Sequence, residues 1–282
     1  MPLAARTVLV TGASRGLGLT FVKQLIKLPS PPEVIIATCR NPSGASELQA
    51  LSQANSSVKV VKLDVEKDED IEECVKTTTS AVGEKGLSLL INNSGIFEPV
   101  GTKSRDVDVS KGKDDHEKGH LTVTKLFGGS LEDQSRALMQ KHFNVNVTSP
   151  IILVQKLLPL LKKAAAQKSS DPLSCSRAGV VNISALLASQ DFTQNYRGGV
   201  SLHYKCSKTA LNMATIMLDH ELRDAGILVT SIHPGWVKTD MGTDLGHMTA
   251  DESIAACLDT MAKADVKSAG KMLNFDGNVL TF

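Results

Sequence analysis

The sequence predicts an α/β fold in which helices cover both faces of a parallel sheet of seven strands. Short runs rich in β-branched residues alternate along the chain with longer amphipathic segments. Most connections between these runs have the length of right-handed crossovers. A glycine-rich turn also follows the first run and opens the first amphipathic segment. Together these features indicate a doubly wound sheet in one domain that spans residues 1–282.

The elements follow from local composition. Strands are expected where short apolar runs rich in valine and isoleucine occur, at TVLV (7–10), EVIIATC (33–39), VKVVKLD (58–64), LSLLINN (87–93), AGVVNIS (178–184), LVTSIHP (228–234) and the weaker KMLNF (271–275). Between them, apolar residues recur at helical spacing, which predicts helices at about 16–28, 44–54, 67–82, 131–164, 203–225 and 251–264.

Two segments depart from this alternation. Residues 98–130 are long, charged and punctuated by glycine, a composition that indicates an insertion on the surface. Residues 240–250, DMGTDLGHMTA, are polar and contain glycine, and they follow the last long strand. We therefore expect a flexible substrate flap at about 240–265.

Composition narrows the choice of partners. The formal net charge is +1, so no broad basic field favours nucleic acid or an anionic membrane surface. The longest apolar run, PIILVQKLLPLL, contains Gln155, Lys156 and Pro159 and is too short to span a membrane. The 5 cysteines lack CxxC and Cys/His spacing, which disfavours a disulfide framework and a metal site. We expect a soluble, cytoplasmic protein with a small-molecule partner.

The residues TGASRGLG (11–18) join the first strand to the first helix. Their glycines permit a sharp turn, a close approach of the backbone to a pyrophosphate, and tight packing of the helix on the sheet. Because the helix begins near Gly16, its free N–H groups and its dipole face the anion. This context predicts a Rossmann-type dinucleotide site lined by Gly12, Ser14, Arg15, Gly16, Leu17 and Gly18.

Two arginines indicate which dinucleotide binds. Sites selective for NAD place a carboxylate at the end of the second strand, where it repels a 2′-phosphate. This chain has TCRN (38–41) there, with Arg40 and no acid, while Arg15 lies in the glycine loop. Two guanidiniums can pair with a phosphate, so NADP(H) is the predicted cofactor. The alternative is that either arginine is a solvated surface charge.

The stretch LHYKCSK (202–208) suggests acid–base chemistry. In a helix, Tyr204 and Lys208 lie four residues apart and share one face. A nearby ammonium favours the phenolate and lowers the pKa of a tyrosine from about 10. Such a tyrosine can exchange a proton with a carbonyl oxygen near neutral pH. A YxxxK pattern alone is common by chance, so its value as evidence depends on the other motifs in the chain.

The motifs taken together resemble the short-chain dehydrogenases/reductases. In the family's order, along essentially the whole chain, stand TGxxxGxG (11–18), Asp64-Val65, NNSG (92–95), Asn146 within FNVNV, the strand VVNIS, YxxxK (204–208) and PGWVKTDM (234–241). The runs GLGLTFVKQLIKLPSPPE, ATCRN and HPGWVKTDMG resemble more narrowly the sniffer-type carbonyl reductases and their C-factor-like relatives. Apart from the insertion at 98–130, little in the chain is out of place.

This resemblance implies roles for the matching residues. Tyr204 would be the general acid in carbonyl reduction, Lys208 would bind the nicotinamide ribose, and Asn146, with Asn144 as its rival, would hold a water that links Lys208 to solvent. The residues implied around the cofactor are Asp64, at the adenine amino group, Val65, Asn93, Ser94 in place of the usual alanine, Gly95, Tyr204, Lys208, Pro234, Val237 and Thr239. Taken alone, Asp64 is equally expected as the cap of the next helix. Pairing through the helices at 131–164 and 203–225 would give a homodimer.

One position departs from the family's pattern. The serine that binds the substrate carbonyl usually stands three residues after the asparagine of the VVNxxS strand. Counted from Asn182, that position is Ala185, and Ser184 comes one residue early. Neighbouring side chains of a strand point to opposite faces, so Ser184 does not simply replace the missing hydroxyl.

Three explanations are open. The strand ends early or carries a bulge, so that Ser184 turns inward and serves. Alternatively, Ser189 or Ser201 supplies the hydroxyl, or no donor replaces it and Tyr204 alone polarises the carbonyl. We prefer the first and take Ser184 as a catalytic residue, because the rest of the machinery is intact.

Two functions remain. The first is an NADPH-dependent oxidoreductase that reduces aldehyde and ketone groups of small apolar substrates. The alternative is a catalytically weakened regulator or scaffold that binds NADP(H), which Ala185 and the charged insertion motivate.

Overall fold

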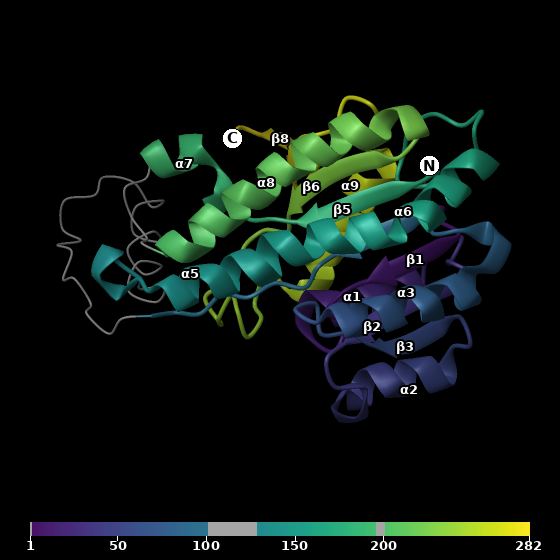
Figure 1. Cartoon of the computed structure of the whole chain (residues 1–282), viewed down its shortest axis with the longest axis horizontal. Helices are drawn as coiled ribbons and strands as arrows, with labels where there is room; N and C mark the ends of the chain where they lie inside the picture. Colours follow the sequence, from purple (N-terminus) through teal and green to yellow (C-terminus); the bar gives the residue numbers. More distant parts are fainter. Residues whose placement is uncertain (1, 101–128, 196–200) are drawn as a thin grey trace.

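One sheet organises residues 2–100, 129–195 and 201–282, which the computed structural model describes (Figure 1). Within them the sheet has 8 strands in the order β3-β2-β1-β4-β5-β6-β7-β8. Their bounds are β1 (Thr7–Val10), β2 (Val34–Cys39), β3 (Val58–Lys62), β4 (Leu89–Asn92), β5 (Gly179–Ile183), β6 (Leu228–His233), β7 (Met272–Asn274) and β8 (Val279–Leu280). All seven predicted strands are confirmed, and the predicted number is corrected by β8, which pairs antiparallel with β7.

Burial explains the strand sequences. Every residue of β1, β2, β4 and β5 is buried, as expected for parallel strands covered on both faces. The edge strand β3 instead exposes Lys59 and Lys62. Since β1 pairs with β2 on one side and with β4 on the other, the chain reverses its direction of travel across the sheet at β1. Ligands of such sheets bind at this switch point, outside the carboxyl ends of the strands.

Helices cover both faces of the sheet, as predicted. One hydrophobic core joins the sheet to α1 and α9, and a second joins it to α3 and α6, which lie in front in Figure 1 with α8. The helical elements are α1 (Gly16–Leu25), η1 (Pro42–Gly44), α2 (Ser46–Ala54), α3 (Asp68–Val82), η2 (Gly83–Lys85), η4 (Leu131–Asp133), α5 (Arg136–Phe143), η5 (Asn144–Thr148), α6 (Ser149–Gln167), η6 (Leu186–Ala188), α7 (Gln190–Asn195), α8 (Leu202–Leu222), η7 (Arg223–Ala225) and α9 (Ala250–Lys263).

Two predicted segments are corrected. The single helix expected at 131–164 is divided into η4, α5, the π turn η5 and α6. The flap expected at 240–265 is too long, because α9 occupies Ala250–Lys263 and buries Ile254, Cys257 and Met261 in the core. Of the predicted insertion at 98–130, residues 101–128 lie outside the described part of the chain.

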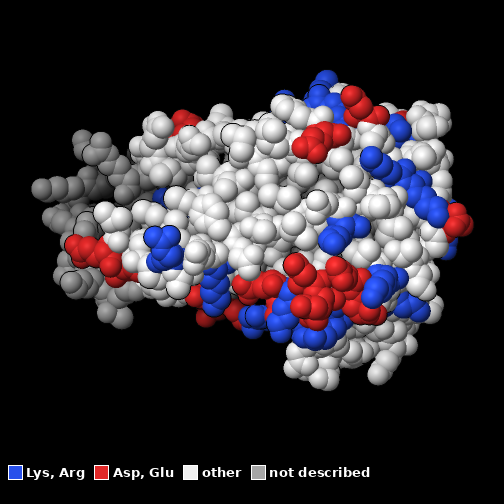
Figure 2. Space-filling model, viewed as in Figure 1, with Lys and Arg blue, Asp and Glu red and all other residues white. Residues whose placement is uncertain are grey.

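Charge is distributed unevenly over the face seen in Figure 2. Acidic and basic side chains gather over α3, whereas the surface over α6 and α8 is mostly uncharged (Figure 2). On α8, Met213 and Met217 are exposed. This is the face through which the predicted homodimer would form, and the oligomeric state stays a prediction. Among the described helices none is long and apolar enough to cross a bilayer.

Candidate active site

A cleft with a volume of about 490 Å³ opens at the switch point. It brings together nearly all the predicted residues: Gly12, Ser14, Arg15, Gly16, Leu17, Gly18, Arg40, Asp64, Val65, Asn93, Ser94, Gly95, Ser184, Tyr204, Lys208, Pro234 and Thr239. Two predicted residues, Asn146 and Val237, are buried and do not belong to the described lining. The lining also contains residues to which the sequence argument gave no individual role, chiefly Ile96, Phe97, Glu98, Lys141, Val145, Asp240 and Met241.

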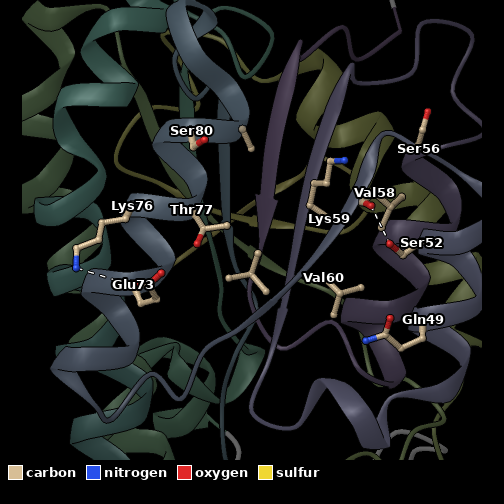
Figure 3. A pocket seen from close by; sticks show the side chains of 12 residues that line it. Gln49, Ser52, Ser56, Val58, Lys59, Val60, Glu73, Lys76, Thr77 and Ser80 are labelled. Atoms are coloured by element: carbon tan, nitrogen blue, oxygen red, sulfur yellow. Dashed lines mark hydrogen bonds and ion pairs between the residues drawn. The ribbon is translucent and has the colours of Figure 1, made fainter.

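A second hollow, of about 800 Å³, is a different kind of feature. It is an open groove along the edge strand β3, between side chains of α2 and α3 (Figure 3). None of the predicted site residues lines its described wall. Lysines on an edge strand commonly serve to block pairing with another chain, and Lys59 stands in this groove. The cleft at the strand ends is therefore the candidate active site.

The end of β4 holds the glycine loop in place. The Thr11 hydroxyl accepts hydrogen bonds from the backbone N–H groups of Asn93 and Ser94, at 2.9 and 2.8 Å. In return, Asn93 Nδ2 donates to the carbonyl oxygen of Thr11 at 2.8 Å. A Cβ atom on Gly18 would lie 2.1 Å from the carbonyl oxygen of Gly12, so only glycine permits this approach of α1 to the loop.

The described residues of this loop fit the pyrophosphate of a dinucleotide. Arg15 is the N-cap of α1, and no described side chain caps the helix there or adds an acid in its first turn. The first N–H groups of a helix have no partner within it, and the dipole favours an anion beside them. Gly16, Leu17 and Gly18 contribute these groups at the wall of the cleft.

The two predicted arginines lie at the mouth of the cleft, and both are exposed. Arg15 pairs with Asp240 at 3.1 Å between Nη1 and Oδ2, but both side chains are 75 % exposed. Solvent weakens such a pair, so Arg15 can exchange Asp240 for another anion at little cost. Asp64 lines the cleft and is not a helix cap, because α3 begins at Asp68 after Lys67.

Tyr204 and Lys208 share the buried face of α8, as predicted. The Lys208 ammonium donates to the carbonyl oxygen of Ile183 at 2.8 Å and lies 6.0 Å from the centre of the Tyr204 ring. Burial lowers the pKa of Lys208 to about 8. Burial also raises the pKa of Tyr204, whereas the sequence argument expected a lowered value. The prediction fails because burial penalises the charged phenolate, while the Lys208 ammonium bonds to Ile183.

Asn146 fastens the chain beside this pair. It lies in the π turn η5, donates from Nδ2 to Ile96 O and Ser207 Oγ, each at 3.0 Å, and accepts from Ile96 N at 2.9 Å. A Cβ on Gly95 would stand 3.3 Å from Asn146 Oδ1, so the amide approaches the cleft wall closely. The rival, Asn144, instead donates to Glu66 near the surface. The expected water at Asn146 stays a prediction.

The missing hydroxyl is not supplied by a bulge. The backbone N–H of Ser184 donates to Ile232 O at 2.8 Å, which continues the β5–β6 ladder beyond Ile183. The Ser184 hydroxyl donates to Asn212 Oδ1 at 2.7 Å and is buried. Ser189 accepts from the N–H of Phe192. The Ser184 proton is therefore already donated to Asn212, whereas Ser189 uses only its oxygen in this contact, so Ser189, Ser201 and the absence of any donor stay open as explanations.

Comparison with known proteins agrees with this architecture. The family model described as short chain dehydrogenase matches residues 6–117 and 122–250. The chain belongs to this family. It is therefore an oxidoreductase. A similar protein, an uncharacterised oxidoreductase of Schizosaccharomyces pombe, is 31% identical over 275 residues, and the match covers 96% of this chain and 89% of the relative.

Two solved carbonyl reductases are similar over their whole length. Carbonyl reductase Sniffer of D. melanogaster has a TM-score of 0.86 and 31% identity, and covers 99% of this chain and 100% of its own. The NADPH-bound carbonyl reductase from chicken fatty liver has a TM-score of 0.84 and 35% identity, with the same coverage. The resemblance to sniffer-type enzymes is thus confirmed.

The approach of Gly18 to Gly12 gives a first prediction. Gly18→Ala will weaken NADPH binding by at least about tenfold, because the new methyl group displaces the loop from the helix N-terminus. Fluorescence titration of NADPH measures the affinity. Gly83→Ala is the control: it lies outside the cleft lining, and no atom within 4 Å opposes the methyl group, although its φ of 54° is unfavourable for alanine and will lower stability. Equal losses of affinity in both variants would contradict the prediction.

Buried histidines make stability depend on pH. Burial lowers the pKa of His142 and His203 and brings that of His233 to about 4. Below about pH 6.5 the unfolded chain therefore binds more protons than the folded one, so stability falls as the pH falls. We expect a lower Tm at about pH 5 than at about pH 7. His233→Gln should reduce this difference, whereas changing the exposed His220 to Gln should not.

Proposed function

We propose that this protein reduces aldehyde and ketone groups of small apolar substrates with NADPH. The observation that carries the proposal is Tyr204, a buried phenol beside Lys208 in a cleft that also contains an uncapped helix N-terminus. Its raised pKa keeps the phenol protonated at neutral pH. A protonated phenol suits donation to a carbonyl oxygen better than removal of a proton from an alcohol.

The mouth of the cleft favours NADPH over NADH. Arg15 and Arg40 offer two guanidiniums for the 2′-phosphate, and the residues after β2 include no acid to repel it. The similar chicken enzyme was solved with NADPH bound. When bound, NADPH supplies the hydride for reduction.

Tyr204 then acts as the general acid. As the carbonyl oxygen gains charge, the phenol donates its proton and becomes a phenolate. The Lys208 ammonium on the same helix face stabilises that anion, and its pKa of about 8 leaves it mostly protonated at neutral pH. Asn146 keeps Ile96 and Ser207 in place around the pair.

The described wall near Tyr204 indicates an apolar substrate. Phe97 presents its ring to Tyr204 at a centroid distance of 5.1 Å and an angle of 74°. Ile96, Val145 and Met241 also line the cleft, and the charged pair of Glu98 and Lys141 lies in the same lining. A carbonyl carried on an apolar group can bury that group here while its oxygen meets Tyr204.

The decisive experiment compares wild type with Tyr204→Phe. We expect the wild type to oxidise NADPH in the presence of a reactive dione, and the variant to lose at least about a hundredfold in kcat/KM because the general acid is gone. Both should bind NADPH equally in a fluorescence titration. If both bind NADPH and neither turns over diones, quinones or aldehydes, the regulator or scaffold function replaces this proposal.

A gain of activity tests the role of Ala185. Ala185→Ser restores a hydroxyl where the family places its second carbonyl donor, and we expect kcat/KM for the dione to rise at least about tenfold. Ser184→Ala is the matched control. Its hydroxyl serves Asn212, so this variant should lose stability without a comparable loss of kcat/KM. A large loss of activity in Ser184→Ala would instead identify Ser184 as the catalytic donor.

A further inference from the structure

The substrate side of the cleft is formed by a short strip, residues 95–98, that is held from behind. Asn146 bonds both backbone groups of Ile96. Two fully buried histidines, His142 on α5 and His203 on α8, hold both backbone groups of Glu98. The strip therefore owes its position to three side chains from two other parts of the chain.

His203 also reaches a second segment. Its Nε2 lies 3.0 Å from the carbonyl oxygen of Glu98, and its Nδ1 lies 3.1 Å from Oε1 of Gln134. The Gln134 amide is oriented by its Nε2, which donates to the carbonyl oxygens of Gly129 and Ser130 at 3.0 and 2.9 Å. Both ring nitrogens of His203 thus face oxygen atoms that can only accept a hydrogen bond.

His142 is arranged differently. Its Nδ1 lies 2.9 Å from the carbonyl oxygen of Leu138, and its Nε2 accepts from the N–H of Glu98 at 3.2 Å. A neutral ring that carries its proton on Nδ1 satisfies both contacts. The two rings meet at a centroid distance of 4.4 Å and an angle of 64°. Protonation of His203 would therefore add a hydrogen bond, whereas protonation of His142 would remove one.

Phe97 connects His203 to the reacting tyrosine. Its ring stacks on His203 with centroids 6.2 Å apart and planes 12° apart, and its edge packs against Tyr204. A Cβ on Gly129 would lie 3.0 Å from Cε1 of His203, so the ring is confined on another side as well. Loss of the His203 contacts would release Phe97 from the position in which it borders Tyr204.

We propose that His203 is a positioning residue for carbonyl reduction: by bonding Glu98 and Gln134 with its two ring nitrogens, it holds Phe97 against Tyr204 on the substrate side of the cleft. The inference rests on the proposed function, since positioning matters only if a carbonyl is reduced there. His203 reaches Tyr204 through Phe97 and is not itself assigned a step in proton transfer.

Protonation adjusts this contact. A neutral His203 has one N–H and can donate to one of its two acceptors, whereas an imidazolium donates to both. Burial lowers the pKa of His203, and the facing His142 lowers it further, whereas Glu98 acts in the opposite direction. Lys141 on α5 pairs with the Glu98 carboxylate, and Tyr204 lies beyond Phe97. Protonation of His203 at low pH therefore allows it to donate hydrogen bonds to both Glu98 and Gln134.

Variants of His203 test the proposal. An asparagine amide can replace Nδ1 and a glutamine amide can replace Nε2, so His203→Asn retains the Gln134 contact and His203→Gln retains the Glu98 contact. We expect His203→Ala to lower kcat/KM for a dione at least about tenfold, with the NADPH affinity changed less than about twofold. His203→Gln should recover most of the loss and His203→Asn less. His220→Ala, at an exposed position of α8, is the control.

Two results would overturn the proposal: an unchanged kcat/KM in His203→Ala, or a loss of NADPH affinity as large as the loss of kcat/KM. A pH profile adds a readout that lost packing would not move. The ratio of kcat/KM between wild type and His203→Gln should stay constant above about pH 6.5 and rise as the pH falls further, since only the wild type gains a second donor. A ratio independent of pH counts against the proposal.

A measurement without turnover separates this inference from the function on which it rests. The chain has 2 tyrosines, so in protein labelled with ¹³C at the tyrosine ring carbon that bears the hydroxyl, Tyr204→Phe assigns the signal of Tyr204. We expect His203→Ala to shift that signal and His203→Gln to restore it. A shift in a protein that turns over no carbonyl would refute the reductase function but support the contact. An unshifted signal would refute the contact.

Discussion

The reciprocal bonding between Thr11 and Asn93 is the interaction on which the site depends. It fastens the end of β4 to the end of β1, the two strands between which the sheet order reverses. On one side of this junction the chain forms the glycine loop and the N-terminus of α1. On the other it continues into residues 95–98, which border Tyr204. Cofactor loop and substrate wall are thus positioned by the same few hydrogen bonds.

The helix that carries Tyr204 is unusual in burying polar residues, and this explains the fate of Ser184. Asn212 of α8 accepts from both Ser184 and Ser231, and Thr215 accepts from Asn182. Buried polar groups need such partners, so these side chains join α8 to β5 and β6. A serine that donates within this network would lose a buried hydrogen bond if its hydroxyl turned toward a substrate.

Much of this could be predicted from the sequence, because the signals were local. The strands could be recognised as β-branched runs. The glycine loop and the Tyr204 helix could be recognised from short motifs of fixed spacing. What escaped prediction depends on contacts between distant residues. His203 and Gln134 are 69 residues apart, and neither belongs to a motif. The direction of the Tyr204 pKa also required knowledge of burial, since the spacing to Lys208 indicated the opposite. The strand β8 is too short for a periodic signal.

The π turn at Asn144–Thr148 has a consequence for how the chain tolerates change in length. A π turn contains one residue more than a turn of α-helix, and such turns are common at functional sites. Removal of a single residue here would let α5 and α6 join as one regular helix, with its backbone hydrogen bonds intact. Because the π turn holds its extra residue within one turn, α5 and α6 would keep their faces, and the change would fall on the residues inside the turn. Asn146 would no longer meet Ile96 and Ser207, so at this point the number of residues matters as much as their identity.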